Sequence, residues 1–197
     1  MNKTDKTIKE QEILLLKKTL GKRLKRIEYV DVMTNDTSWN KIRLHFDLLS
    51  IDINCNLENL SNDKSELCDE FGIISITHPT DGEKLEVNEI SSDTSTVKIN
   101  KLVNSIAIIN ENIKTKQFNE VISTKTTTKS IIFSLEDSFL GVDRRIFYDE
   151  VLTFKFGKRK EDVFHDDSDS WTSDRDEDSL TFEYSLEQIT KTYKSDT

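Results

Sequence analysis

Hydrophobic and polar residues alternate along much of the chain, and this pattern predicts a β-rich protein. The clearest stretch is 50–57, where Ile51, Ile53 and Cys55 fall on one face and polar residues on the other. Further strands are predicted at 42–46, 72–78, 84–90, 97–110, 130–136, 140–151, 152–156 and 180–185. The intervening breaks are polar, at 59–66, 91–96 and 124–129. We therefore expect an antiparallel sheet.

One helix is predicted at 8–20. Thr7 and Glu10 have the spacing of a capping box, apolar residues recur at helical intervals, and Gly21 follows as a C-cap. Basic residues then cluster in 17–26, where cations complement the C-terminal end of a helix dipole. The predicted fold class is α+β, mainly antiparallel β with an N-terminal helix, in a single compact domain.

The segments 152–156 and 180–185 share their alternation, which predicts that they pair with Lys155 opposite Glu183. Such pairing makes 157–178 a connection of 22 residues. Connections of this length are either functional or disordered.

Two stretches of the sequence resemble each other. KIRLHFD with SIDI, and SIIFSLED with GVDR, both run as a strand, an acid, a short turn and a second strand with an aspartate after an aliphatic residue. A duplicated β-meander is one interpretation. Chance similarity between hairpins in a chain of biased composition is the other, so the sequence leaves both open.

Size and composition bound the class of protein. A chain of 197 residues can bury roughly 70% of its unfolded surface in one domain, so it needs no disulfides or metals to fold. Two cysteines are too few for a disulfide framework, and no apolar run approaches the ~18 residues of a membrane span. The N-terminus does not read as a signal peptide, and scarce Ala, Gly and Pro suggest an AT-rich genome or a mobile element such as a phage. We expect a cytoplasmic protein with no membrane partner.

Charge divides the chain into two parts. The whole chain carries 37 acids and 28 bases, which gives −9. Residues 161–197 contain 12 acids and 3 bases, also −9, so residues 1–160 balance at 25 of each. We predict a charge-balanced α+β body at 1–160 and an acidic C-terminal segment at 161–197, whose final strand, 180–185, pairs back to the body. A neutral body argues against nucleic acid as the main target, because binding phosphates needs a concentrated cationic face.

The acidic stretch 164–182 contains seven acids and Trp171. It does not fit a calcium loop, because the register that begins at Asp166 puts Trp171 at the glycine position and the register from Asp167 puts it at a ligand position. A solvated loop is one interpretation, and a docking segment anchored by the tryptophan and steered by the charges is another. The acids could also pair internally with 17–26 or 157–160. The candidate partner-binding residues are Asp166, Asp167, Asp169, Trp171, Asp174, Asp176, Glu177 and Asp178.

Other candidate chemistry is weaker. Widely spaced glycines exclude dinucleotide fingerprints, P-loops and the G-x-S-x-G nucleophile elbow. Zinc sites bring ligands in close pairs, which the spacing of the histidines and cysteines does not provide. Those four residues are His45, Cys55, Cys68 and His78. The stretch 142–150 groups Asp143 with two arginines before Asp149 and Glu150, a set that can bind phosphate or perform acid–base chemistry.

The sequence favours a small non-enzymatic binding protein of the inhibitor, immunity or anti-defence type, which docks on another protein with a basic surface and needs no cofactor or metal. One alternative is a carboxylate-based, metal-dependent enzyme that uses Asp143, Asp149 and Glu150 or the acidic stretch. The other is a structural subunit that forms homo-oligomers or larger assemblies through strand edges. The identity of the partner and the oligomeric state lie beyond the sequence.

Overall fold

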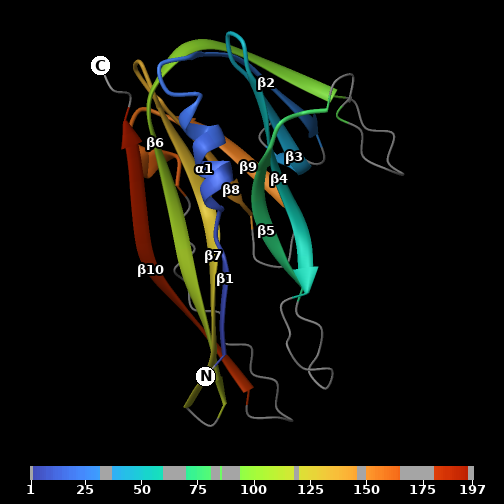
Figure 1. Cartoon of the computed structure of the whole chain (residues 1–197), viewed down its shortest axis with the longest axis vertical. Helices are drawn as coiled ribbons and strands as arrows, with labels where there is room; N and C mark the ends of the chain where they lie inside the picture. Colours follow the sequence, from blue (N-terminus) through green and yellow to red (C-terminus); the bar gives the residue numbers. More distant parts are fainter. Residues whose placement is uncertain are drawn as a thin grey trace.

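The structure is a computed structural model of the chain, and it describes residues 2–31, 37–59, 70–80, 85, 94–117, 120–145, 150–164 and 180–194. Within these residues the protein is mostly β-strand, with one α-helix near the N-terminus (Figure 1). The elements in chain order are β1 (Asn2–Lys6), α1 (Glu10–Lys17), β2 (Arg23–Asp31), β3 (Thr37–His45), β4 (Ser50–Asn59), β5 (Glu70–Thr77), β6 (Thr94–Gln117), β7 (Glu120–Leu135), β8 (Phe139–Arg144), β9 (Val151–Gly157), a 3₁₀ turn η1 (Lys160–Asp162) and β10 (Leu180–Lys194).

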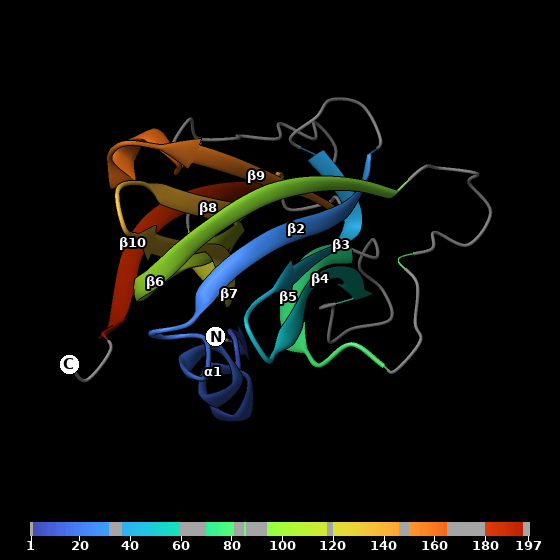
Figure 2. The ribbon, with the colours of Figure 1, turned by 90° about the horizontal axis from the view of Figure 1, so that it is seen from above.

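The strands form one mixed sheet that closes on itself. Successive hydrogen-bonded neighbours run β6–β2–β3–β9–β8–β7, and β7 pairs again with β6, so these six strands make a ring. The curl is visible in the view from above (Figure 2). Three extensions leave the ring: β1 pairs in parallel with β7, β10 pairs antiparallel with β6, and the β4–β5 hairpin continues from β3.

Strand β3 changes partner along its length, and this change creates the branch. Residues 37–39 pair with β9, whereas residues 41–45 pair with β4. Asn40 lies between the two sets with φ 39°, a left-handed conformation that asparagine tolerates better than most residues. Its N–H donates to the carbonyl of Glu150 at 3.0 Å. A single residue therefore redirects the strand from one neighbour to the other.

The main hydrophobic core lies between the curved strands and the helix. Strands β2 to β9 contribute aliphatic and aromatic side chains to it, and Leu15 and Leu16 of α1 are buried against them. The helix lies in front of the gap between the β1–β7 side and the β4–β5 hairpin (Figure 1). Each fully buried side chain of this kind contributes about 1.5–3 kcal/mol. Burial of one face of nearly every strand thus explains the alternation in the sequence.

A smaller apolar cluster lies apart from the main core and holds the chain beyond β9. Val163 is buried against Ala107, Ile109 and Ile132 of β6 and β7. Gly141 of β8 permits this approach, because a Cβ there would lie 2.2 Å from the carbonyl oxygen of Val163. The 3₁₀ turn is consequently fixed to the sheet.

The predicted helix forms, but it is shorter and capped differently. It runs over Glu10–Lys17, and the carboxylate of Glu12 accepts from the N–H of Lys9 at 2.7 Å. The predicted cap, Thr7, instead donates its N–H to Asp5 at 2.9 Å. Glu12 also accepts from the N–H of Ile76 at 2.8 Å, so it joins the helix to β5.

Several predicted strands have other limits, the predicted break at 124–129 is wrong, and the break at 91–96 is wrong over its last three residues, which begin β6. Residues 124–129 lie inside β7, and 97–110 belongs to a single strand of 24 residues. The predicted basic cluster begins at the last residue of α1, Lys17, and ends in β2, where Arg23, Lys25 and Arg26 lie. The alternation did not reveal β2. The predicted strand at 84–90 lies outside the described residues, apart from Leu85, which is buried.

The predicted pairing of 152–156 with 180–185 is wrong. Lys155 of β9 lies opposite Gly141 of β8, and Glu183 of β10 lies opposite Lys114 of β6. Both segments do form strands. Their shared alternation identified strands with one buried face, but it carried no information about which neighbour each one pairs with.

The two similar stretches form hairpins with the same register. In β3–β4, His45 lies opposite Ser50, and in β7–β8, Ser134 lies opposite Phe139, an offset of 89 residues on both strands. Both turns are closed by an N–H bonded to a carbonyl three residues later, at 2.7 Å in the first hairpin and 2.8 Å in the second. Duplication of a meander remains a prediction.

Candidate functional site

The predicted docking residues, Asp166 to Asp178 with Trp171, all lie outside the described residues. The described residues on both flanks contact the sheet. On one side Val163 is buried and Phe164 packs against the same apolar cluster. On the other side Leu180 begins β10, opposite Gln117 at the end of β6. The two flanks of the acidic stretch are therefore both joined to β6.

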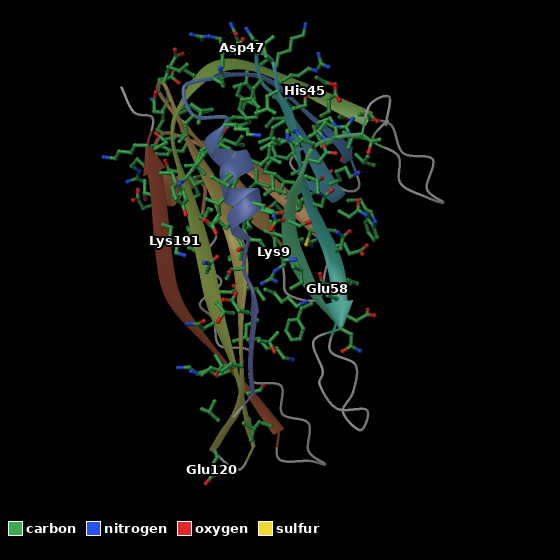
Figure 3. The ribbon with its side chains drawn as sticks, viewed as in Figure 1. Lys9, His45, Asp47, Glu58, Glu120 and Lys191 are labelled. Atoms are coloured by element: carbon green, nitrogen blue, oxygen red, sulfur yellow. The ribbon has the colours of Figure 1, made fainter. Side chains whose placement is uncertain are left out.

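Three of the six basic residues in 17–26, Arg23, Lys25 and Arg26, have acidic partners within the body. Lys25 contacts Asp47 at 2.9 Å, Arg23 contacts Glu136 at 3.1 Å, and nearby Lys101 contacts Asp137. Hydrogen bonds from Lys25 and from the N–H of Arg23 lower the pKa of Asp47, so this carboxylate stays ionised. Figure 3 shows Asp47 at the end of the molecule where this network lies. Local carboxylates thus neutralise much of the basic cluster.

The second basic candidate, 157–160, has a partner of its own. Arg159 contacts Asp162 at 2.8 Å, three residues along the chain. Hydrogen bonds from Arg159 lower the pKa of Asp162. This pair is formed within η1 and its flanks, so it does not draw on the acidic residues from 166 onward.

Asp143 and Arg144, two of the candidates of 142–150, do not share a face of the sheet. Asp143 and Arg144 are consecutive residues of β8, so their side chains point to opposite faces of the sheet. The carboxylate of Glu150 accepts from the N–H of Leu57 at 3.4 Å. Asp149 lies outside the described residues.

No metal centre is formed by the residues that the structure describes. Among them, no group of three His, Cys, Asp or Glu side chains is placed to hold an ion. Cys55 is buried in the main core, as its position on the apolar face predicted. His78 is exposed, and Cys68 lies outside the described residues.

A buried ionic network, which the sequence did not reveal, crosses the sheet. Glu111 of β6 and Arg144 of β8 form an ion pair with no exposed side-chain surface. Thr127 of β7 donates to Glu111 at 3.1 Å, and Arg144 donates to the carbonyl of Gly72 in β5. The network therefore connects four strands. Its threonine comes from 124–129, the segment predicted as a break, and partners distant in sequence make this polar segment a buried strand.

The face opposite the main core carries a second polar network, on β2, β3 and β4. Arg43 and Asp52 form a buried bidentate ion pair, with Nε to Oδ1 at 2.7 Å and Nη2 to Oδ2 at 2.9 Å. The predicted alternation placed Asp52 and Ser50 on this polar face, and the structure confirms the position. Opposed residues of neighbouring strands lie on the same face, so the register assembles these side chains into cross-strand rows.

Two adjacent rows bring together Ser50, His45 and Glu28. His45 Nδ1 lies 3.0 Å from Ser50 Oγ, and His45 Nε2 lies 2.9 Å from Glu28 Oε2. The other carboxylate oxygen of Glu28 accepts from Arg26 Nε at 2.9 Å. The side chains of His45 and Glu28 are 19% and 21% exposed, so solvent reaches the group. Figure 3 shows His45 near the turn that carries Asp47.

Electrostatics keep Glu28 ionised. Burial by itself raises the pKa of this carboxyl group, but hydrogen bonding and charge from His45 and Arg26 outweigh that effect, and the pKa lies below its ordinary value. The alternation over 42–46 correctly predicted that His45 lies on a polar face. The contacts with Ser50 and Glu28 depend on the registers of two strand pairs, for which no local signal exists.

In the part of the chain that the structure describes, no helix has the length and apolar character to cross a membrane. Comparison with known proteins found no matching family, no matching curated protein and no matching solved structure.

Proposed function

We propose that the chain is a small binding protein that acts by docking its acidic segment on a partner protein with a basic surface. The proposal starts from the charge distribution, because residues 161–197 carry the whole excess of −9 while residues 1–160 are balanced. Concentrated charge of one sign accelerates association with an oppositely charged partner. Trp171, in the middle of the acids, supplies an aromatic anchor of the type that dominates binding energies.

The observation that carries the proposal is the pairing of the basic residues within the body. If the acidic segment served only to neutralise 17–26, the cations there would lack other partners. Instead Arg23 and Lys25 contact Glu136 and Asp47. These contacts leave fewer cations for the acidic segment to pair with internally, which supports an external partner.

The flanks of the segment support the same proposal. The buried Val163 fixes one flank and the pairing of Leu180 with Gln117 fixes the other. Recognition segments are commonly held on a rigid scaffold at both ends. The buried ion pair between Glu111 and Arg144, which joins the two strands that flank β7, contributes to that rigidity.

The class of partner follows from the chemistry of the segment. Closely spaced carboxylates around a tryptophan match a basic protein surface with an apolar pocket. Inhibitors, immunity proteins and anti-defence proteins of mobile elements work by covering such a surface in the cytoplasm. The proposal assigns the chain to this class by its chemistry, and it requires neither a cofactor nor a metal.

The test compares three matched variants with the wild type. The first replaces the four acids nearest the tryptophan, as D167N, D169N, D174N and D176N. The second is W171A. The control replaces four exposed acids of the body and its border, as E10Q, E70Q, E120Q and E161Q, which removes the same charge from elsewhere. Each protein is immobilised and exposed to lysate of the native cell at low and moderate salt, and captured proteins are quantified by mass spectrometry.

We expect one partner, basic at its contact surface, to be held by the wild type and the control and lost from the first two variants. Capture should weaken as salt rises, because exposed charges are screened over about 8 Å at physiological ionic strength. Equal capture by all four proteins would place the interface on the body and refute the docking role of the segment. A partner lost from the control alone would do the same.

A further inference from the structure

A second site lies on the polar face of the sheet, and it is independent of the acidic segment. The registers place Lys98 opposite Arg26, Arg26 opposite His45, and His45 opposite Ser50, across β6, β2, β3 and β4. Opposed residues share a face, so these four side chains form one continuous row. Glu28 stands in the adjacent row and contacts His45.

The two ring nitrogens of His45 have different neighbours. Glu28 Oε2 lies 2.9 Å from Nε2, an ion-pair contact that does not have the geometry of a hydrogen bond. Ser50 Oγ lies 3.0 Å from Nδ1, and its hydroxyl donates there in the tautomer that leaves Nδ1 unprotonated. A serine hydroxyl beside one imidazole nitrogen, with a carboxylate beside the other, is the grouping that activates serine nucleophiles.

We propose that Ser50 is the nucleophile of an acyl-transfer site, that His45 is its general base and acid, and that the site hydrolyses carboxylic esters that carry a negative charge. The charge preference comes from Arg26 and Lys98, which are exposed and continue the row beyond His45. Glu28 is a positioning residue, because it acts through His45. The proposal does not rest on the docking function and stands or falls separately.

The reaction balances with an ester and water as the only reactants. Ser50 Oγ attacks the acyl carbon while its proton moves to His45 Nδ1, and the C–O bond to the alcohol then breaks as that proton passes to the departing oxygen. Water next attacks the acyl-serine and gives a proton to Nδ1. The carboxylic acid leaves, and the proton returns to Ser50 Oγ.

The site also has an ordinary structural interpretation, which predicts different behaviour. Cross-strand polar groups stabilise a sheet by about 0.2–1 kcal/mol per pair. A trio with only that role would leave Ser50 as unreactive as any exposed serine. Covalent reactivity of one serine therefore separates the two interpretations, whereas loss of stability in a variant does not.

The first experiment treats the full-length protein with a fluorophosphonate and maps the adduct by peptide mass spectrometry. The second follows release of p-nitrophenol from p-nitrophenyl acetate and from an anionic counterpart, the mono-p-nitrophenyl ester of terephthalic acid. The variants are S50A, H45Q, E28Q and E28D. The controls are S75A, a partly exposed serine on the same face, and H78Q, an exposed histidine elsewhere. Circular dichroism verifies that each variant is folded.

We expect the adduct on Ser50, no adduct in S50A, and a rate at least about 100-fold lower in H45Q, the scale of lost acid–base catalysis. The anionic ester should react faster than the acetate. S75A and H78Q should match the wild type. E28Q should lower kcat with little change in KM, and E28D should restore part of the loss. Arg26, Arg43, Asp52 and Lys98, which share this face, are unchanged in every variant.

Three results would overturn the proposal. One is a folded wild type with no adduct and no ester hydrolysis above the solvent rate. Another is an adduct that maps to a different residue or persists in S50A. The third is an H45Q variant that reacts as fast as the wild type. The binding experiment on the acidic segment is unaffected by any of these results, so the two proposals fail separately.

Discussion

The contribution of the buried ion pair between Glu111 and Arg144 to the free energy of unfolding can be measured directly. Both side chains have no exposed surface, and they belong to β6 and β8, which are not neighbours in the sheet. We would replace each alone, as E111Q and R144M, and both together. The amide side chain introduced by E111Q retains an acceptor for the hydroxyl of Thr127, which donates to the native carboxylate at 3.1 Å, so this change removes mainly the charge.

The magnitudes follow from the cost of leaving a charge alone in the interior. Removing one member of a buried pair typically costs about 3–5 kcal/mol, whereas replacing the whole pair by neutral groups is often close to neutral. The carbonyl of Gly72 loses its donor in R144M and in the double variant, which costs about 1–3 kcal/mol. We therefore expect each single variant to lose about 3–5 kcal/mol and the double variant only about 1–3 kcal/mol.

Urea unfolding, followed by far-UV circular dichroism and tryptophan fluorescence, measures the free energy of unfolding of all four proteins. Two-state domains have a total stability of about 5–15 kcal/mol, so the single variants should still show a measurable transition. A strongly favourable coupling energy, at least about 3 kcal/mol, is expected from the double-mutant cycle. If the double variant loses the sum of the two single losses, the two side chains do not act as a pair and the reasoning is refuted.

Three further predictions concern other contacts. The pKa of Glu28 lies below its ordinary value of 4.5, so its ionised form stabilises the folded protein above about pH 4.5 and that contribution disappears as the pH falls through the lower folded-state value. The melting temperature of E28Q should therefore lie below that of the wild type at pH 7, with a smaller difference at about pH 3. G141A should lower the free energy of unfolding by about 1–3 kcal/mol or more, because the added Cβ would lie 2.2 Å from the carbonyl oxygen of Val163; an unchanged urea midpoint would contradict this. E12A should speed hydrogen exchange at the amide of Ile76, which donates to Glu12 at 2.8 Å, by far more than at amides in the centre of β7.

The sequence determined which residues face the core and which face away from it. Alternation over 50–57 placed Ile51 and Ile53 on one face and Ser50 and Asp52 on the other, and the structure confirms this division, although Asp52 is buried in an ion pair with Arg43. It also determined that the protein is β-rich with one helix near its start. These features are local, since burial of one face imposes a period of two on a strand wherever its partner comes from.

Only the tertiary structure decided which strands pair and which polar residues meet. The segment 124–129 looked like a break because its own residues are polar, yet Thr127 is buried against Glu111 and Arg144 from other strands. In the same way β9 and β10 have similar patterns but different neighbours. Any strand can satisfy the backbone hydrogen bonds of another, so the choice of neighbour depends on the packing of the whole sheet.

The grouping of Ser50, His45 and Glu28 also depends on the tertiary structure. The sequence placed His45 on a polar face, but its contacts with Ser50 and Glu28 follow from the registers of β3 with β4 and of β2 with β3. A shift of one residue in either register would turn one partner to the opposite face and separate the group. The sequence therefore determined the chemistry of each residue, while the registers of the strand pairs determined which residues became its neighbours.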